Sequence, residues 1–125
     1  MSNSLQNNIG LLVLRVGVSA MMLTHGLPKL LNLISGDFSF SDPLGLGSTV
    51  TLILAVIAEA LCPVLIIFGI RTRLSAIPPA FAMAVAAFIV HDTDPFATKE
   101  KALLFLVAFI AIALLGPGKY AIGRK

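Results

Sequence analysis

Charged residues are scarce in this 125-residue chain, at 12% of the sequence. A water-soluble domain of this size has about 25%, because its surface must be solvated. Hydrophobic residues, by contrast, make up 58% of the chain. A lipid bilayer requires no polar covering over the spanning part of a protein. The composition therefore excludes an ordinary soluble fold and indicates an integral membrane protein embedded in the lipid bilayer.

Cysteine is nearly absent as well. Cys62 is the only one, which excludes an intrachain disulfide and a metal site built on a cysteine pair. The net charge of +3 does not indicate nucleic acid, because no basic run with interleaved aromatic residues is present. The first ten residues lack the positive charges that open a signal peptide, so we expect the first helix to be retained.

Four apolar segments predict an all-α fold, an integral membrane four-helix bundle that forms a single transmembrane domain over residues 1–125. The predicted spans are about residues 9–33, 48–70, 74–90 and 101–115. A helix needs roughly 20 residues to cross a bilayer, so the last two spans are short. Polar, glycine and proline residues separate the spans, and Gly116-Pro117-Gly118 ends the fourth.

The distribution of Lys and Arg predicts the orientation in the membrane. With four spans, both termini and the turn between the second and third spans share one side. That side holds Arg71, Arg73, Lys119, Arg124 and Lys125. The opposite side mixes cations with acidic residues: Lys29, Asp37, Asp42, Asp92, Asp94, Lys99, Glu100 and Lys101. The positive-inside rule then places both termini in the cytoplasm and, in a bacterium, the acidic loops in the periplasm.

Four ionisable side chains fall inside the first two spans and are the main candidate site residues. They are Arg15, His25, Lys29 and Glu59. A charge at a helix centre costs about 2.5–3.5 kcal/mol, so each of these groups needs a partner or a purpose. At 100° per residue, one stripe of the first helix should face the interior, with His25 at its border: Arg15, Ser19, Met22, Gly26 and Lys29.

Glu59 lies on a comparable stripe of the second helix, so we expect Glu59 to contact Arg15 or His25. Two interpretations of these groups stay open. A buried ion pair often only fixes the register of two helices. The alternative is a ligand-binding, proton-relay or catalytic role.

Two weaker candidates lie near the predicted ends of the third and fourth spans. His91 precedes Asp92 and Asp94, but such a run is more typical of a solvated helix end, and we predict no metal site. Glu100 lies next to the fourth span and is expected to favour its N-terminus, or to reach His25 or Lys29.

Several motifs together resemble the DoxX family of small bacterial membrane proteins. The first helix carries Leu14-Arg15-Val16-Gly17 and His25-Gly26-Leu27-Pro28-Lys29-Leu30. Glu59, the run Gly69-Ile70-Arg71-Thr72-Arg73 and the ending Gly116-Pro117-Gly118-Lys119-Tyr120 follow in order. The resemblance implies a four-helix protein of the bacterial inner membrane, with family positions at Arg15, His25, Gly26, Lys29 and Glu59. It also implies a link to quinone handling or oxidative stress.

Three functions follow as hypotheses. The leading one is a subunit of, or an accessory to, a quinone-linked redox system, in which His25 binds a quinone carbonyl and Glu59 relays a proton. The chain has no flavin or nucleotide motif, so whether it is itself an enzyme stays open and a redox partner is expected. The second is a non-catalytic scaffold for a soluble enzyme. The third is a small proton-coupled transporter, although the absence of tryptophan argues against it. Oligomeric state, including a homo-oligomer, stays open.

Overall fold

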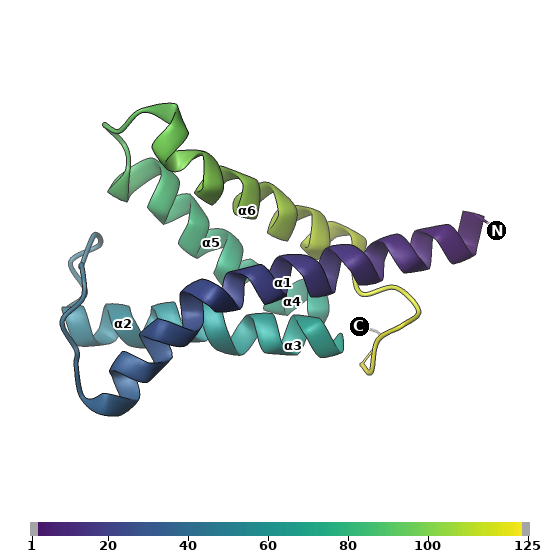
Figure 1. Cartoon of the computed structure of the whole chain (residues 1–125), viewed down its shortest axis with the longest axis horizontal. Coiled ribbons are helices and arrows are strands. Elements are labelled where there is room, and N and C mark those ends of the chain that lie inside the picture. Colours follow the sequence, from purple (N-terminus) through teal and green to yellow (C-terminus); the bar gives the residue numbers. More distant parts are fainter. Residues whose placement is uncertain (1–2, 124–125) are drawn as a thin grey trace.

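The computed structural model of the chain describes residues 3–123, and these form four antiparallel helical rods (Figure 1). The first rod is α1 (Asn3–Ser35). The second joins α2 (Ser48–Val56), the π-helical segment η1 (Ile57–Leu61) and α3 (Cys62–Phe68). The third joins α4 (Thr72–Ser75), α5 (Ile77–Val85) and the π-helical segment η2 (Ala86–Val90). The fourth is α6 (Phe96–Leu115).

Three of these rods are long and apolar enough to cross a membrane: Ser4–Ser35, Ser48–Phe68 and Thr72–Val90. The fourth, α6, has 20 residues but carries Lys99, Glu100 and Lys101 near its start. Its uncharged part, residues 102–115, is about 21 Å long at 1.5 Å per residue, shorter than a hydrocarbon core of about 30 Å.

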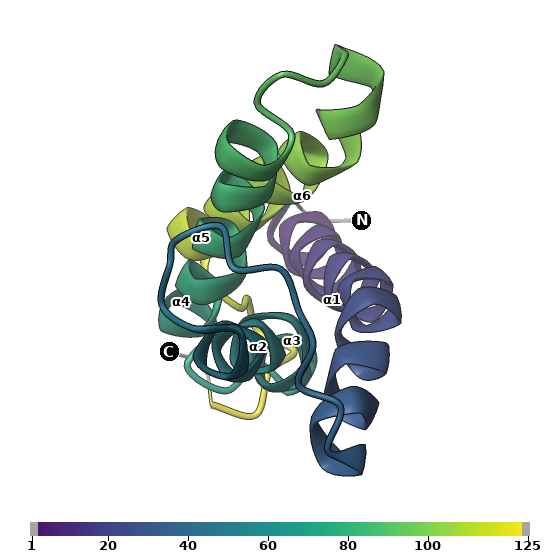
Figure 2. The same cartoon turned by 90° about the vertical axis from the view of Figure 1, so that its left-hand side faces the viewer.

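The bundle has two chemically different ends (Figures 1 and 2). One end, here called the loop end, carries the loops 36–47 and 91–95. The other, the termini end, carries the turn at Gly69 and both described ends of the chain. There the Lys119 amide donates to Asn8 Oδ1 at 2.9 Å, and the Ile122 amide donates to the Phe68 carbonyl at 2.9 Å. The C-terminal segment is thus bound to α1 and α3.

The polar stripe predicted for the first helix faces the interior, as expected. Arg15 is 2% exposed, and Ser19 and Met22 are fully buried. The central core continues across the other rods through large apolar side chains, chiefly Ile66, Phe109 and Ile112. These apolar contacts fill the termini half of the bundle.

Two details of the second rod were not predicted from the sequence and both involve Glu59. The segment η1 is π-helical, and Glu59 lies at its centre; such bulges occur frequently at functional sites. Gly26 of α1 packs directly on this bulge, because a Cβ at Gly26 would collide with the Glu59 backbone carbonyl. The contact fixes the height at which α1 meets Glu59.

Candidate functional site

Glu59 pairs with Lys29, and the distance from Lys29 Nζ to Glu59 Oε1 is 2.6 Å. The Glu59 side chain is 5% exposed and the Lys29 side chain 27%. Lys29 Nζ also lies 5.6 Å from the centre of the Phe40 ring, within reach of a cation–π contact. An apolar residue of the loop 36–47 therefore covers the ammonium group, and the ion pair lies between α1, η1 and this loop.

The expectation that Glu59 contacts Arg15 or His25 was wrong. Gly26 meets the Glu59 backbone, so the carboxylate lies level with the next turn of α1, where Lys29 is. Arg15 lies 11 residues before Gly26, about 16 Å away along the helix at 1.5 Å per residue. The described residues provide no hydrogen bond or ion pair between His25 and Glu59, although both line one cavity.

Arg15 instead binds backbone carbonyls at the termini end. Its Nη1 donates to the Pro117 carbonyl at 2.6 Å. Its Nη2 donates to the carbonyls of Tyr120 at 2.7 Å and Ile67 at 3.2 Å. Backbone carbonyls are a known way to stabilise a cation within a membrane protein. Arg15 thus fastens the C-terminal segment to α3 and takes no part in the Glu59 site.

An apolar cavity of about 550 Å³ lies on one side of the Lys29–Glu59 pair. Its walls come from the second and third rods and from the loop 36–47. They include Phe40, Leu44, Leu54, Ala58, Phe81 and Ala82. The polar groups of the pair are the only charged groups among the described residues of its lining. A large apolar space with a few polar groups is the usual form of a small-molecule site.

A smaller polar cavity of about 210 Å³ lies on the other side of the pair. Its lining draws on every rod: His25, Lys29, Glu59, Met83, Ala86, His91, Thr98, Lys101, Ala102 and Phe105. His25 stands with its ring edge against Phe105, with 5.8 Å between ring centres. Lys29 and Glu59 line both cavities, so the ion pair forms part of the wall between them.

The structure brings four of the six sequence candidates together. His25, Lys29, Glu59 and His91 line the polar cavity, whereas Arg15 and Glu100 do not. His91 Nδ1 also lies 2.8 Å from Asp94 Oδ2. No group of three metal-ligand side chains occurs within the described range.

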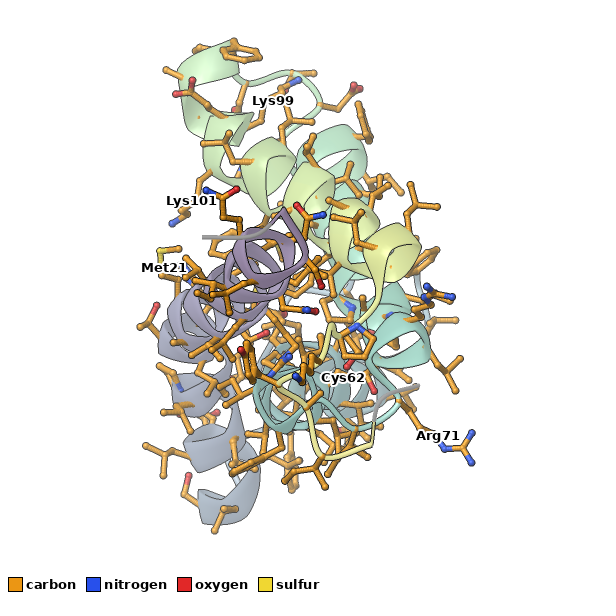
Figure 3. The ribbon with its side chains drawn as sticks, turned by 90° about the vertical axis from the view of Figure 1, so that its right-hand side faces the viewer. Met21, Cys62, Arg71, Lys99 and Lys101 are labelled. Carbon is orange, nitrogen blue, oxygen red and sulfur yellow. The ribbon has the colours of Figure 1, made fainter. Side chains whose placement is uncertain are left out.

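Lys101 lines the polar cavity and was missed from the sequence, because its place beside Lys99 and Glu100 suggested only an interfacial charge. The two lysines point in different directions from α6 (Figure 3). The signal available in the sequence was their spacing of two residues, which places them on different faces of a helix. Lys99 instead donates to the Asp92 carbonyl at 3.1 Å.

The loop 36–47, which supplies Phe40, is held in place by Asp42. Its carboxylate accepts hydrogen bonds from Thr51 Oγ1 at 2.7 Å and from the amides of Gly47 at 2.8 Å and Leu46 at 3.0 Å. These bonds favour the ionised form, with the Thr51 hydroxyl contributing most, and they hold the pKa of Asp42 below its ordinary value. The loop is therefore tied to the start of α2, next to the apolar cavity.

Comparisons with known proteins give consistent results. A family model described as DoxX matches residues 10–92. Inner membrane protein YqjF of Escherichia coli K12 is 28% identical over 123 residues, which cover 94% of this chain and 92% of that protein. A Haemophilus influenzae Rd protein described as uncharacterized is 29% identical over 123 residues, covering 90% and 87% of the two chains. No solved structure matches this chain.

Proposed function

This chain belongs to the DoxX family and is a multi-pass inner membrane protein, and on that basis we propose that it binds a quinone or a quinone-like lipid-soluble ligand. In this role it is a subunit of, or an accessory to, a redox or oxidative-stress system. It contributes the ligand site, and a partner enzyme supplies or accepts the electrons. The resemblance to quinone-linked family members suggested this ligand class, and the apolar cavity supports it.

The observation that carries the proposal is the position of the Lys29–Glu59 pair at the wall of the 550 Å³ cavity. A quinone ring is apolar on both faces and has a carbonyl at each end. The Lys29 ammonium has three donor protons and can donate to such a carbonyl, while the Glu59 carboxylate can accept from a hydroquinone hydroxyl. The pair can thus bind both redox states of the ligand, the quinone through Lys29 and the hydroquinone through Glu59.

This assignment replaces His25 by Lys29 as the donor to the ligand. His25 lines the polar cavity and is absent from the lining of the apolar one. Arg15 is excluded from ligand contact in this proposal, because its guanidinium is occupied by backbone carbonyls at the termini end. Glu59 keeps the role of proton acceptor.

The proposed orientation follows from the charges at the two ends. Among the described residues, the termini end carries Arg71, Arg73 and Lys119 and no acidic side chain. Arg71 extends away from the bundle (Figure 3). We therefore place the termini end in the cytoplasm and the loop end in the periplasm, in accord with the positive-inside rule.

The test is ligand binding by the purified protein in mild detergent. A short-tailed ubiquinone should raise the melting temperature in a concentration-dependent way, because a ligand that binds only the folded state stabilises it. Ala82 lines the apolar cavity, whereas Ala84 on the same helix does not. Ala82→Phe should therefore abolish the stabilisation, and Ala84→Phe should preserve it.

A second comparison tests the polar end of the site. Lys29→Met and Glu59→Gln should each raise the dissociation constant for ubiquinone at least tenfold. Arg71→Gln, at an exposed position, should leave it unchanged. The proposal is rejected if ubiquinone produces no stabilisation of the folded wild-type protein, or if Ala82→Phe and Ala84→Phe bind it equally well.

A further inference from the structure

The polar cavity has more room and more polar partners than a packed bundle requires. Its volume of about 210 Å³ far exceeds the roughly 10–15 Å³ that one water molecule needs. Its walls carry the hydroxyl of Thr98, the rings of His25 and His91, and the charges of Lys29, Glu59 and Lys101. A buried water molecule needs two to four polar partners, and these six polar side chains can supply them.

The cavity reaches the surface at the loop end. Thr98 and Lys101, on the first turns of α6, are exposed, and His91 follows directly after η2. Glu59, at the inner end, is nearly fully buried. The lining therefore leads from an exposed mouth at Thr98 and Lys101 to a buried carboxylate.

Toward the termini end the bundle interior is largely apolar. Met22, Ile66 and Phe109 are fully buried and belong to one continuous apolar core. In the described lining of the apolar cavity, the polar side chains besides the ion pair are the hydroxyls of Ser41 and Thr51, which also lie at the loop end. Among the cavities of the described chain, the one with several charged groups in its lining opens at the loop end.

We propose that the polar cavity is a water-filled proton port, which connects the Lys29–Glu59 pair with the aqueous phase at the loop end only. A proton passed from the aqueous phase along the water of the port binds the Glu59 carboxylate, which breaks the ion pair. The reverse step restores it. This inference holds whether or not the apolar cavity binds a quinone, so the two proposals fail independently.

The titratable groups that face Glu59 across the port come from three parts of the chain. α1 contributes His25 and Lys29, the loop after η2 contributes His91, and α6 contributes Lys101. The third rod contributes only the apolar side chains of Met83 and Ala86. Protonation of Glu59 therefore leaves a port lined by cationic and neutral groups only.

The first experiment measures water access with single cysteines, in a Cys62→Ala background in which the variants are shown to fold. Ala102 lines the port and is 8% exposed, whereas Ala87 is fully buried and lines neither cavity. A charged, membrane-impermeant thiol reagent should modify Ala102→Cys at least 100-fold faster than Ala87→Cys. In sealed vesicles, the modification should occur from one side only, the same side that modifies Thr98→Cys. Equal rates at positions 102 and 87, or access from both sides, would overturn the port.

The second experiment follows the proton itself. Infrared difference spectra recorded after a pH jump contain a carboxyl band of Glu59, identified by its loss in Glu59→Gln. A bulky thiol reagent attached at Thr98→Cys blocks the mouth, and the change of this band after the pH jump should then be at least tenfold slower. The same reagent at Leu104→Cys, which is exposed on α6 outside the port, should have no effect on that rate. An unchanged rate in the blocked protein would reject the proton route, even if the cavity contains water.

Discussion

Lys29 Nζ lies 2.6 Å from Glu59 Oε1, and this ion pair belongs to the walls of both the apolar and the polar cavity. A lipid-soluble ligand and a water-borne proton would therefore meet at the same two side chains from opposite sides. The π-helical segment η1 and the close contact of Gly26 set the position of the pair.

Removing one member of the ion pair should be asymmetric in its cost. Lys29→Met leaves a nearly buried carboxylate without a counter-charge, and we expect a loss of about 2–3 kcal/mol in unfolding free energy, below the about 3–5 kcal/mol of a fully buried pair. Glu59→Gln leaves Lys29, which is 27% exposed and can extend to water, so we expect about 1 kcal/mol. Equilibrium unfolding in mixed micelles measures both values.

The double variant provides the control for that series. Lys29→Met combined with Glu59→Gln should cost less than Lys29→Met alone, because no uncompensated charge remains. Strictly additive costs would show that the two side chains do not interact in the folded protein.

Gly26→Ala should destabilise the bundle, whereas the same change at Gly17 should not. A Cβ at Gly26 would collide with the Glu59 carbonyl, which is backbone and cannot turn aside, while at Gly17 no atom lies within 4 Å. We expect Gly26→Ala to cost about 1–3 kcal/mol through overpacking. Gly17→Ala should gain up to about 1 kcal/mol, because alanine has the higher helix propensity. Thermal unfolding of the two variants compares them directly, and equal stability would contradict the close contact.

The sequence predicted the rods and the buried stripe of α1, but it could not predict the partner of Glu59. A period of 100° per residue is enough to place Arg15, Lys29 and their neighbours on one face. Which of them meets Glu59 depends on the relative height of two helices. That height is set by the Gly26 contact and by the extra residue that a π-helical turn inserts, neither of which has a sequence period.

The two cavities were beyond sequence reasoning for a similar reason. The apolar cavity depends on where the loop 36–47 folds back, and Phe40 reaches Lys29 only because Asp42 ties that loop to α2. Lys101, near the start of α6, joins the polar cavity beside His25 and Lys29 of α1. Such placements depend on long-range packing and not on local pattern.

Arg15→Lys should loosen the C-terminal segment without unfolding the bundle. A lysine ammonium lacks the planar fork with which Arg15 binds the carbonyls of Pro117 and Tyr120 at once. We expect hydrogen exchange of the Ile122 and Gly123 amides, which donate to the end of the second rod, to accelerate at least tenfold. The matched control is Arg71→Lys, at an exposed arginine, which should leave these amides unchanged. Equal exchange rates in both variants would show that Arg15 does not hold the C-terminal segment in place.

The loop 36–47 should loosen in acid. Because the folded-state pKa of Asp42 is depressed, the stabilisation is fully present above the ordinary aspartate pKa of about 3.9 and is lost as the pH falls through the lower folded value. Exchange of the Gly47 amide, corrected for its intrinsic pH dependence, should therefore become less protected below about pH 4. Asp42→Asn should remove this pH dependence, since no titrating group remains. A Gly47 amide that stays equally protected down to pH 2 would contradict the role of the Asp42 carboxylate in holding the loop.

The charge of the proton port should be measurable through the reagents that enter it. The lining carries Lys29, Lys101, His25 and His91 against the single carboxylate of Glu59, so an anionic thiol reagent should modify Ala102→Cys faster than a cationic one. At about 6 Å in a water-like dielectric, one unit charge contributes about 0.7 kcal/mol. Removing the Lys101 charge slows the anionic reagent and speeds the cationic one, each by about 0.7 kcal/mol. Lys101→Gln should therefore lower the ratio of the anionic to the cationic rate about tenfold.

Lys99→Gln is the matched control for this measurement, because it removes the same charge two residues away, from a lysine bound to the Asp92 carbonyl outside the port. The ratio of the two reagent rates should stay within about twofold of the parent protein, since the Lys99 ammonium is held at the Asp92 carbonyl and does not line the port. An equal fall in both variants would show that the reagents sense only the general surface charge of α6. Retention of the ratio in Lys101→Gln would show that the Lys101 ammonium does not face the port.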